Sequence, residues 1–233
     1  MLSCKTLITQ LAAGSWDKRL NHLYCCNGGE KLEAVRARAI EAVKRYQALF
    51  SAGDDVQVAL FSSPGRTELG GNHTDHQHGC VLAASVNMDM LSVAAPNGTN
   101  QVRIHSEGYP VLTVDLSNLS PVENEKETSA SLVRGVAARM TELGQAPAGF
   151  DAYVCSSVPA GSGLSSSAAY EVLVGTIFNV LFCNQVFTPV QVAQIGQYAE
   201  NVFFGKPCGL MDETASAVGG VVSIDLKDPS NPV

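Results

Sequence analysis

The sequence is poor in charged and aromatic residues and has no block of basic residues. Charged residues make up 16% of the 233 residues and aromatic residues 6%, whereas hydrophobic residues reach 45%. This balance is typical of a globular chain and excludes a disordered one. The net charge of −7, without a basic patch or zinc-finger spacing, argues against a nucleic-acid partner.

Long hydrophobic runs and targeting signals are also missing. No apolar run approaches the roughly 20 residues that a membrane span needs, so no membrane partner is expected. The N-terminus carries Lys5, Asp17 and Lys18 and lacks the apolar stretch and small-residue cleavage site of a secretory signal. The default expectation is therefore a cytoplasmic protein.

The seven cysteines form no paired framework. Their odd number, together with the absence of Cys-x-x-Cys and zinc-ribbon spacings, argues against a disulfide scaffold or a structural zinc module. Cys155 and Cys183 fall in apolar stretches and are expected to be small buried hydrophobic residues. Reduced thiols fit a cytosolic location.

Hydrophobic periodicity predicts a mixture of strands and helices. The expected strands are 56–63, 81–95, 102–106, 111–115, 150–157 and 220–226. The expected helices are 30–50, 129–142, 165–183, 188–203 and 208–217. Residues 1–29 have weak periodicity and are interpreted as an N-terminal extension. The hairpin-type neighbours among the strands favour an α+β fold over a doubly wound sheet.

The most informative segment runs from Pro159 to Ala169 and combines glycine and serine at the start of a predicted helix. Gly161 and Gly163 permit backbone angles and a close approach that a Cβ would forbid. The serines at 165–167 lie where a helix leaves its first N–H groups unpaired, at the positive end of its dipole. One interpretation is an anion cradle, most often filled by phosphate; a capped helix without a ligand is the other.

A second glycine-rich segment, residues 64–79, lies between two predicted strands and is expected to be a loop. Asp75 can accept hydrogen bonds from two hydroxyls, and Asn72 can both donate and accept, as sugar recognition requires. Arg66 can pair with a carboxylate or a phosphate. These residue types favour a polar binding loop.

A metal site is an alternative for the same loop. Its ligands would be His73, Asp75, His76 and His78. Structural zinc usually needs a second cluster of ligands elsewhere in the sequence, and none is evident. A glycine loop with a purely structural role is a further alternative.

The third segment spans residues 205–213 and contains Asp212 among apolar and small residues. A carboxylate in this setting is either a helix cap or a functional acid whose pKa depends on burial and a partner. Glu200 lies earlier in the chain and could supply a second carboxylate. The alternative is that Glu200 lies on a solvent-exposed helix face without a functional role.

Taken in order, these segments resemble the galactokinase branch of the GHMP small-molecule kinases. Residues 159–169 resemble the phosphate loop of that superfamily, and residues 208–212 resemble the segment with its catalytic aspartate. Gly65-Arg66 followed by His73-Thr74-Asp75 resembles the galactokinase sugar signature. Order and approximate spacing match across residues 56–226. The resemblance implies the N-terminal half of a GHMP kinase, with a fold like domain 2 of ribosomal protein S5.

The resemblance also implies a reaction. The protein would use ATP to phosphorylate the anomeric C1 hydroxyl of galactose or a galactose-like sugar. Asp212 would be the base, or the acceptor that orients this hydroxyl. Arg66 would keep Asp212 ionised and stabilise charge on the transferring phosphoryl group, since phosphoryl transfer needs alignment and charge neutralisation more than covalent chemistry.

The remaining site residues follow from the same resemblance. The ATP phosphates would contact Pro159, Gly161, Ser162, Gly163, Leu164, Ser165, Ser166 and Ser167. The sugar would contact Asn72, His73, Asp75 and, through its backbone, Gly209. Mg²⁺ would be held by Ser167 and Glu200 while it keeps several waters.

Some residues depart from the family pattern. Asn72 stands where galactokinases normally have Glu, and Glu213 stands where they usually have Gln. After Asp75, His76-Gln77 replaces the usual Tyr-Asn pair. Because the family's Glu lies toward the C6 end of the sugar, its replacement predicts tolerance for a sugar that differs from galactose at C6, a uronic acid included.

The resemblance further predicts an incomplete cleft. Family members are longer and carry a third, glycine-rich motif in a C-terminal half, and nothing after Gly220 supplies one. Residues 30–233 are therefore expected to be the N-terminal domain without its C-terminal GHMP domain, and residues 228–233 a linker. Alone, this part would bind weakly and turn over poorly, because water exclusion and positioning need both walls.

Two competing functions stay open. One is a non-catalytic sugar sensor or regulator on the same fold, since fold does not fix function. The complete serine–alanine stretch at residues 165–169 and the presence of Asp212 favour the enzyme. The other is a different GHMP kinase, such as a mevalonate or homoserine kinase, which His73-Thr74-Asp75 disfavours. The sequence leaves the oligomeric state open.

Overall fold

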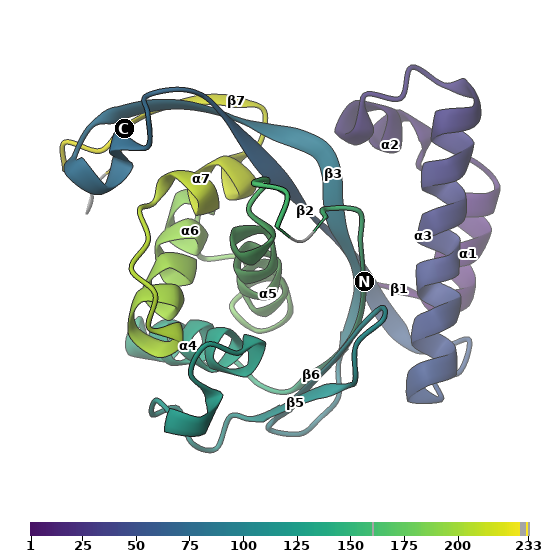
Figure 1. Ribbon diagram of the computed structural model, residues 1–233. Helices are drawn as coiled ribbons and strands as arrows, with labels where there is room; N and C mark the ends of the chain where they lie inside the picture. The colour runs from purple at the N-terminus through teal and green to yellow at the C-terminus, as the bar shows by residue number, and fades with distance from the viewer. Residues whose placement is uncertain (160, 229–231, 233) are drawn as a thin grey trace.

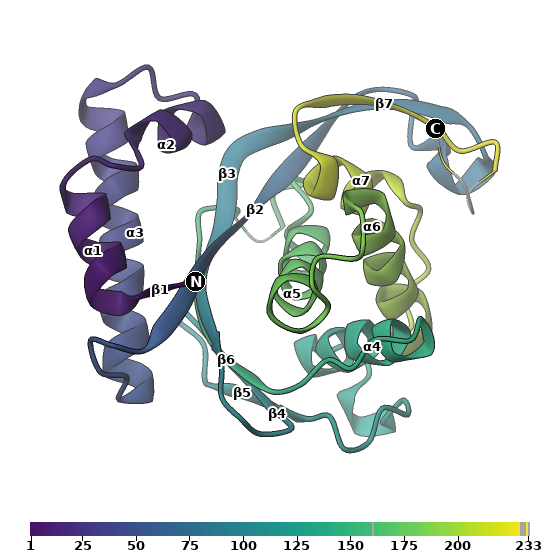
Figure 2. The ribbon, with the colours of Figure 1, turned by 180° about the vertical axis from the view of Figure 1, so that it is seen from behind.

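The protein is described by a computed structural model over residues 1–159, 161–228 and 232. In this part of the chain one strongly curved seven-stranded sheet separates two groups of helices. One group lies inside the concave face of the sheet and the other packs against its outer face (Figure 1), as the view from behind in Figure 2 confirms. No helix among these residues is long and apolar enough to cross a membrane.

The sheet is antiparallel except for one pair of strands. Its strands are β1 (Leu2–Ser3), β2 (Gln57–Gly70), β3 (Cys80–Pro96), β4 (Gln101–Ser106), β5 (Leu112–Asp115), β6 (Phe150–Ser156) and β7 (Val221–Asp225). Their order is β1-β2-β3-β6-β4-β5, with β7 paired to the start of β3, and only β4 and β6 run parallel. This arrangement confirms the expected mixed α and β fold.

The helices fall into an outer and an inner layer. The outer helices are α1 (Cys4–Ala12), α2 (Asp17–Tyr24) and α3 (Gly29–Phe50). The inner helices are α4 (Ser129–Glu142), α5 (Ser166–Phe182), α6 (Pro189–Tyr198), the π-helical turn η3 (Ala199–Phe204) and α7 (Met211–Val218). Two short 3-10 helices, η1 (Thr74–Gln77) and η2 (Glu123–Glu125), lie in connections.

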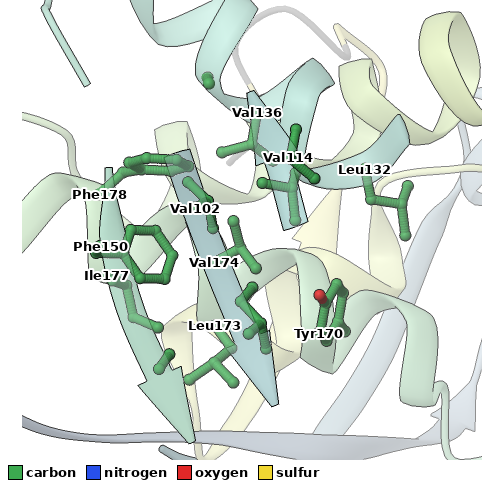
Figure 3. Packing of buried hydrophobic residues seen from close by; sticks show 14 of the residues in the cluster. Val102, Val114, Leu132, Val136, Phe150, Tyr170, Leu173, Val174, Ile177 and Phe178 are labelled. Atoms are coloured by element: carbon green, nitrogen blue, oxygen red, sulfur yellow. The ribbon is translucent and has the colours of Figure 1, made fainter. Parts of the chain in front are cut away.

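Helix α5 runs through the middle of the inner layer and is apolar on nearly all sides. Its residues Leu173, Ile177 and Phe178 are almost fully buried between the sheet and the other inner helices, as Figure 3 shows. The ring of Phe178 packs edge-on against Phe150 of β6 at a centroid distance of 5.1 Å. Because α5 is held along its length by apolar burial, the position of its N-terminus is fixed.

The outer layer is attached to the sheet by a buried polar network around Asp89 of β3. Tyr24 of α2 donates a hydrogen bond to Asp89 Oδ2 at 2.6 Å, and Ser62 of β2 donates to the same oxygen at 2.5 Å. Arg38 of α3 pairs with Asp89 Oδ1 at 2.5 Å and donates to the backbone oxygen of Cys155. A buried carboxylate is tolerated when it is paired in this way.

Several expected boundaries are corrected by the structure. The segment at 64–79 is not a loop throughout, because β2 continues to Gly70 with register shifts between Pro64 and Arg66 and between Glu68 and Gly70. Helix α7 begins at Met211 rather than at Cys208. The helix expected over 188–203 changes at Ala199 from α6 into the π-helical turn η3.

Other expectations are confirmed or lie outside the described residues. Cys155 and Cys183 are buried. Residues 1–29 form β1, α1 and α2, which share a hydrophobic cluster with α3, so the extension is part of the packed structure. Most of the expected linker, residues 229–231 and 233, lies outside the described residues.

We expect Asp89→Ala to destabilise the fold by about 3–5 kcal/mol, because it leaves Arg38 and two hydroxyls without their buried acceptor. The control is Glu41→Ala, which removes an exposed ion pair with Arg45 and should cost less than about 1 kcal/mol. Urea unfolding followed by circular dichroism measures both. Equal midpoints for the two variants would show that the network contributes nothing to stability.

Candidate functional site

The three segments singled out in the sequence meet at one carboxylate, that of Asp212 in the first turn of α7. Arg66 of β2 donates from Nε to Asp212 Oδ1 at 2.5 Å and from Nη2 to Asp212 Oδ2. Ser165, the residue before α5, donates its hydroxyl hydrogen to Oδ2 at 2.6 Å. The same guanidinium donates from Nη1 to the backbone oxygen of Gly163 at 2.6 Å. The arginine therefore joins the acid to the glycine–serine loop.

Asp212 is not a helix cap, so that alternative is wrong. The residue at the N-cap of α7 is Leu210, and no side chain caps this helix. The Arg66 side chain is 9% exposed and that of Asp212 is 28% exposed, so the pair is mostly shielded from water. A bidentate arginine–carboxylate pair of this kind fixes the orientation of both groups.

The glycine–serine loop borders a cavity of about 270 Å³ that also contains the ion pair. It is lined by Arg66, Pro159, Gly161, Ser162, Gly163, Ser165, Ser166, Ser167, Lys206 and Asp212. The wall is polar and carries two cations, Arg66 and Lys206. Together with the N-terminus of a 17-residue helix, this lining suits an anion.

The backbone of the loop explains its glycines. Gly161 and Gly163 have positive φ angles of 72° and 77°, and Ser165 has a φ of 53°. The neighbouring Gly65 of β2 is also required, because a Cβ there would lie 2.9 Å from the backbone oxygen of Leu164. Leu164 does not line the cavity; its oxygen accepts from Arg66 N at 3.0 Å and anchors the loop to β2.

The polar loop that contains η1 contacts the segment before α7. Asp75 Oδ2 accepts a hydrogen bond from Met211 N at 3.3 Å. Gly209 lies so close that a Cβ on it would be 1.8 Å from Asp75 Oδ2. Asn72 and His73 are exposed on this loop, each with a φ of 51°. The four residues expected to bind sugar therefore lie in one loop and in the segment that touches it.

Glu68 is a member of this region that the sequence reasoning missed. Its Oε1 accepts from His73 N at 2.9 Å, and its Oε2 lies 3.1 Å from His73 Nε2. The sequence does place a carboxylate two residues after Arg66. It was overlooked because residues 64–79 were expected to be a loop throughout. A carboxylate thus stands beside His73 although Asn72 is neutral.

The histidine metal site is not formed in the described structure. Among the described residues the only group of three metal-binding side chains consists of Glu200, Cys208 and Glu213, and it contains none of the histidines. His76 lies near Asp75, with Nδ1 3.5 Å from Oδ1, and His73 pairs with Glu68. The metal alternative for residues 73–78 therefore has no group of three ligands among the described residues.

Glu200 is buried rather than solvated, which corrects the alternative of an exposed helix face. Its side chain is 5% exposed, and Oε1 lies 3.8 Å from Nζ of Lys206. Glu171 of α5 and Glu213 of α7 are completely buried nearby. Burial, with repulsion from Glu213 and Glu200, raises the pKa of Glu171 to about 10, and burial raises the pKa of Glu213 as well.

A second, larger cavity of about 690 Å³ adjoins the loop and was not foreseen. Ser166 and Ser167 line both cavities. The remaining wall is mostly apolar and aromatic, and includes Tyr109, Leu112, Val158, Tyr170 and Phe204. A polar cradle that opens beside an apolar pocket suits a ligand with an anionic end and a flat apolar end.

Comparisons with known proteins agree with this geometry. Residues 131–220 match the model of the GHMP kinases N terminal domain. Residues 44–96 match the galactokinase galactose-binding signature. The structure of a mevalonate kinase from Methanococcus jannaschii superposes with a TM-score of 0.62 at 13% identity, over 74% of this chain and 55% of that one, a likeness of fold alone. The fold and the cradle thus define the N-terminal domain of a GHMP kinase.

Galactokinase from Lactococcus lactis is 35% identical over 178 residues, which are 76% of this chain and 44% of the relative. The crystal structure of that galactokinase in complex with galactose superposes with a TM-score of 0.72 at 30% identity, over 79% of this chain and 48% of that one. The chain thus carries the GHMP kinases N terminal domain and the galactokinase galactose-binding signature, and it is similar to the N-terminal portion of galactokinases. It spans about half the length of these relatives.

We expect Gly209→Ala to displace the Asp75 carboxylate and to change stability little, because the clash is with the end of a side chain. If Asp75 contacts the sugar, as the resemblance implies, its displacement should weaken galactose binding by about tenfold or more, the usual effect of a hydrogen bond to a charged group. Calorimetric titration with galactose and thermal unfolding measure the two effects. Gly53→Ala is the control, since nothing lies within 4 Å of its added Cβ. Unchanged galactose affinity in Gly209→Ala would contradict the assignment.

Proposed function

We propose that the protein is an ATP-dependent kinase that phosphorylates the C1 hydroxyl of galactose or a galactose-like sugar. The observation that carries this proposal is the joint contact of Arg66 and Ser165 with the Asp212 carboxylate. It brings the galactose-binding signature, the phosphate cradle and the acidic segment to one point. A phosphoryl-transfer site needs these parts within reach of each other.

In the proposed mechanism Asp212 accepts the hydrogen of the sugar hydroxyl, either as a base or as the acceptor that orients it. The hydroxyl oxygen forms a bond to the γ-phosphorus of ATP as the bond to the ADP oxygen breaks, and the proton passes to Asp212. Arg66 keeps the carboxylate oriented through its two hydrogen bonds. Its charge also stabilises the phosphoryl group during transfer.

ATP is proposed to occupy both cavities. Its phosphates would lie in the polar cradle, against the loop backbone, Lys206 and the N-terminus of α5. The base would enter the apolar pocket beside Tyr109 and Phe204, because the two cavities share Ser166 and Ser167. This division follows the polarity of the two walls.

Two oxygen donors suitable for Mg²⁺ lie in or behind the wall of the cradle. Ser167 lines it directly, and the Glu200 carboxylate lies 3.8 Å from Nζ of Lys206, which also lines it. Hard oxygen ligands of this kind fit Mg²⁺, which would neutralise charge on the phosphates. We therefore retain Ser167 and Glu200 as the proposed magnesium ligands.

The sugar is proposed to contact Asn72, His73, Asp75 and the backbone at Gly209. Asn72 is neutral where galactokinases normally have Glu. Glu68 nevertheless places a carboxylate in this region, because it contacts His73. Discrimination at C6 is therefore proposed to depend on Glu68 together with Asn72. A negatively charged C6 group would be repelled by Glu68 and could be hydrogen-bonded by Asn72.

The kinase activity is proposed for a protein that also contains the C-terminal half found in the longer relatives. The Asp212 side chain is 28% exposed in the described structure, so the cleft is not closed over the reacting groups. Residues 30–233 alone should bind both substrates weakly, because phosphoryl transfer needs water excluded from both sides. A cytoplasmic location remains a prediction.

We expect Asp212→Asn to lower kcat for galactose by about 10²–10⁴-fold, because the amide cannot accept the proton. The change should leave galactose binding nearly intact. Coupled ADP-release kinetics on the longest natural chain that contains these residues measure kcat. Asp115→Asn, which changes an exposed residue of β5, is the control. A sugar sensor would instead bind galactose and show no turnover in either the wild type or the variant.

We further expect Glu68→Gln to raise the kcat/KM ratio of galacturonate to galactose by about tenfold, which corresponds to ~1.4 kcal/mol. The reason is the loss of like-charge repulsion at the C6 end of the sugar. The same ADP-release assay on both sugars measures this ratio. Glu33→Gln on the outer helix α3 is the matched control and should not change it. If Glu68→Gln leaves this ratio unchanged, Glu68 does not take part in the recognition of C6.

A further inference from the structure

Beneath the phosphate cradle, buried glutamate side chains lie close to one another and to the thiol of one cysteine. Glu171 lies one turn beyond Ser167 on α5, Glu200 lies on η3, and Glu213 lies on α7. Cys208, in the segment before α7, completes the group. Ligand atoms of Glu200, Cys208 and Glu213 all lie within 4.8 Å of one another.

Three buried carboxylate oxygens of this cluster lack a hydrogen-bond partner, although the Cys208 thiol donates to Glu213 Oε1. Glu171 and Glu213 are 0% exposed. Neither side-chain oxygen of Glu171 has a hydrogen-bond partner in the structure, and Oε2 of Glu213 has none. Both side chains converge over Gly196 of α6, where an added Cβ would lie 3.5 Å from Glu171 Oε2 and 3.6 Å from Glu213 Cγ. Buried charges of this kind are normally paired or bound to a metal ion.

We propose that Glu200, Cys208 and Glu213, with the unpartnered Glu171 beside them, form a buried binding site for a divalent transition-metal ion of the zinc class. A thiolate with carboxylates is a ligand set that zinc accepts. At a tetrahedral zinc ion a sulfur and an oxygen ligand lie about 3.6 Å apart. Cys208 Sγ and Glu213 Oε1 are 3.5 Å apart in the structure.

The backbone of Cys208 is held in place from two sides. Its N–H donates to Asn201 Oδ1 at 2.7 Å, and its oxygen accepts from Gln197 Nε2 at 3.3 Å. Fixed outer partners of this kind orient a metal ligand. Cys208 is also half-buried beside the exposed Lys206, which provides a path for the ion to enter. Burial and the nearby Glu213 and Glu200 raise the pKa of the Cys208 thiol, so binding must displace protons from the cluster.

This site shares Glu200 with the proposed magnesium site and differs from it in its other ligands, Cys208 and Glu213. Magnesium would be held by Ser167 at the cradle together with ATP phosphates, whereas the thiol and the two fully buried carboxylates lie beneath the cradle. Glu200 stands between the two sites. The proposal does not rest on the kinase activity, because it can be tested without sugar or nucleotide.

The test uses the longest natural chain, freed of metal by chelation and titrated with Co²⁺ and then with Zn²⁺. We expect Co²⁺ to produce the near-ultraviolet absorption of a cobalt–thiolate bond, with one ion bound per chain. Zn²⁺ should abolish this absorption, and excess Mg²⁺ should not. Cys208→Ser should eliminate the absorption, and the matched control Cys80→Ser, which changes an exposed cysteine, should retain it.

The thermal midpoint with and without Zn²⁺ is a second measurement, and it also shows whether each variant is folded. Zn²⁺ should raise the thermal midpoint of the wild-type chain and of Ser167→Ala, which changes the cradle and leaves Glu200, Cys208 and Glu213 in place. Glu213→Gln, which removes a ligand, should weaken Zn²⁺ affinity by more than the roughly 10- to 100-fold that the loss of an outer partner costs. Absence of a cobalt–thiolate band in the folded wild type would overturn the proposal. So would equal Zn²⁺ stabilisation of the wild type and Glu213→Gln.

Discussion

The ion pair between Arg66 and Asp212 is the constraint on which the site depends. A carboxylate that is mostly shielded from water is costly unless it is paired, and removal of one partner leaves the other uncompensated. Arg66 reaches Asp212 only when the second half of β2 lies against the start of α7, and its Nη1 also donates to the backbone oxygen of Gly163. One side chain thus fixes the distances between β2, the cradle and the Asp212 carboxylate.

The apolar core supports this polar pair from below. Helix α5 is buried along most of its length, so its N-terminal serines cannot move independently of the sheet. The outer helices add a second support, because Arg38 binds the oxygens of Asp89 and Cys155 in the two central strands, β3 and β6. Residues far from the cradle therefore contribute to its geometry, and rigid support of this kind is what a precisely positioned site needs.

The sequence allowed the periodic elements and the three polar segments to be predicted, because these depend on local patterns. Helix α5 belongs to this group, whereas the paired roles of Arg66 and Asp212 were predicted only from the resemblance to a known family. The extension of β2 to Gly70 could not be predicted, since the glycines that suggested a loop accommodate register shifts in a strand. Glu171 escaped notice because its surroundings come from α6, η3 and α7, and a carboxylate in an apolar helix gives no sign of its distant neighbours. Lys206 was missed for the same reason.

The charges around the cradle impose a condition on anion binding. Of the described residues that line it, only Arg66 and Lys206 carry a positive charge, and Arg66 is already paired with Asp212. Glu171, Glu200 and Glu213 lie behind this wall, and if all were ionised their field would oppose the phosphates. Burial raises the pKa of Glu171 to about 10, which keeps that group neutral near pH 7. A bound cation would cancel the charge of the others. Either way, the acids beneath the cradle must be neutralised before phosphate can bind strongly above them.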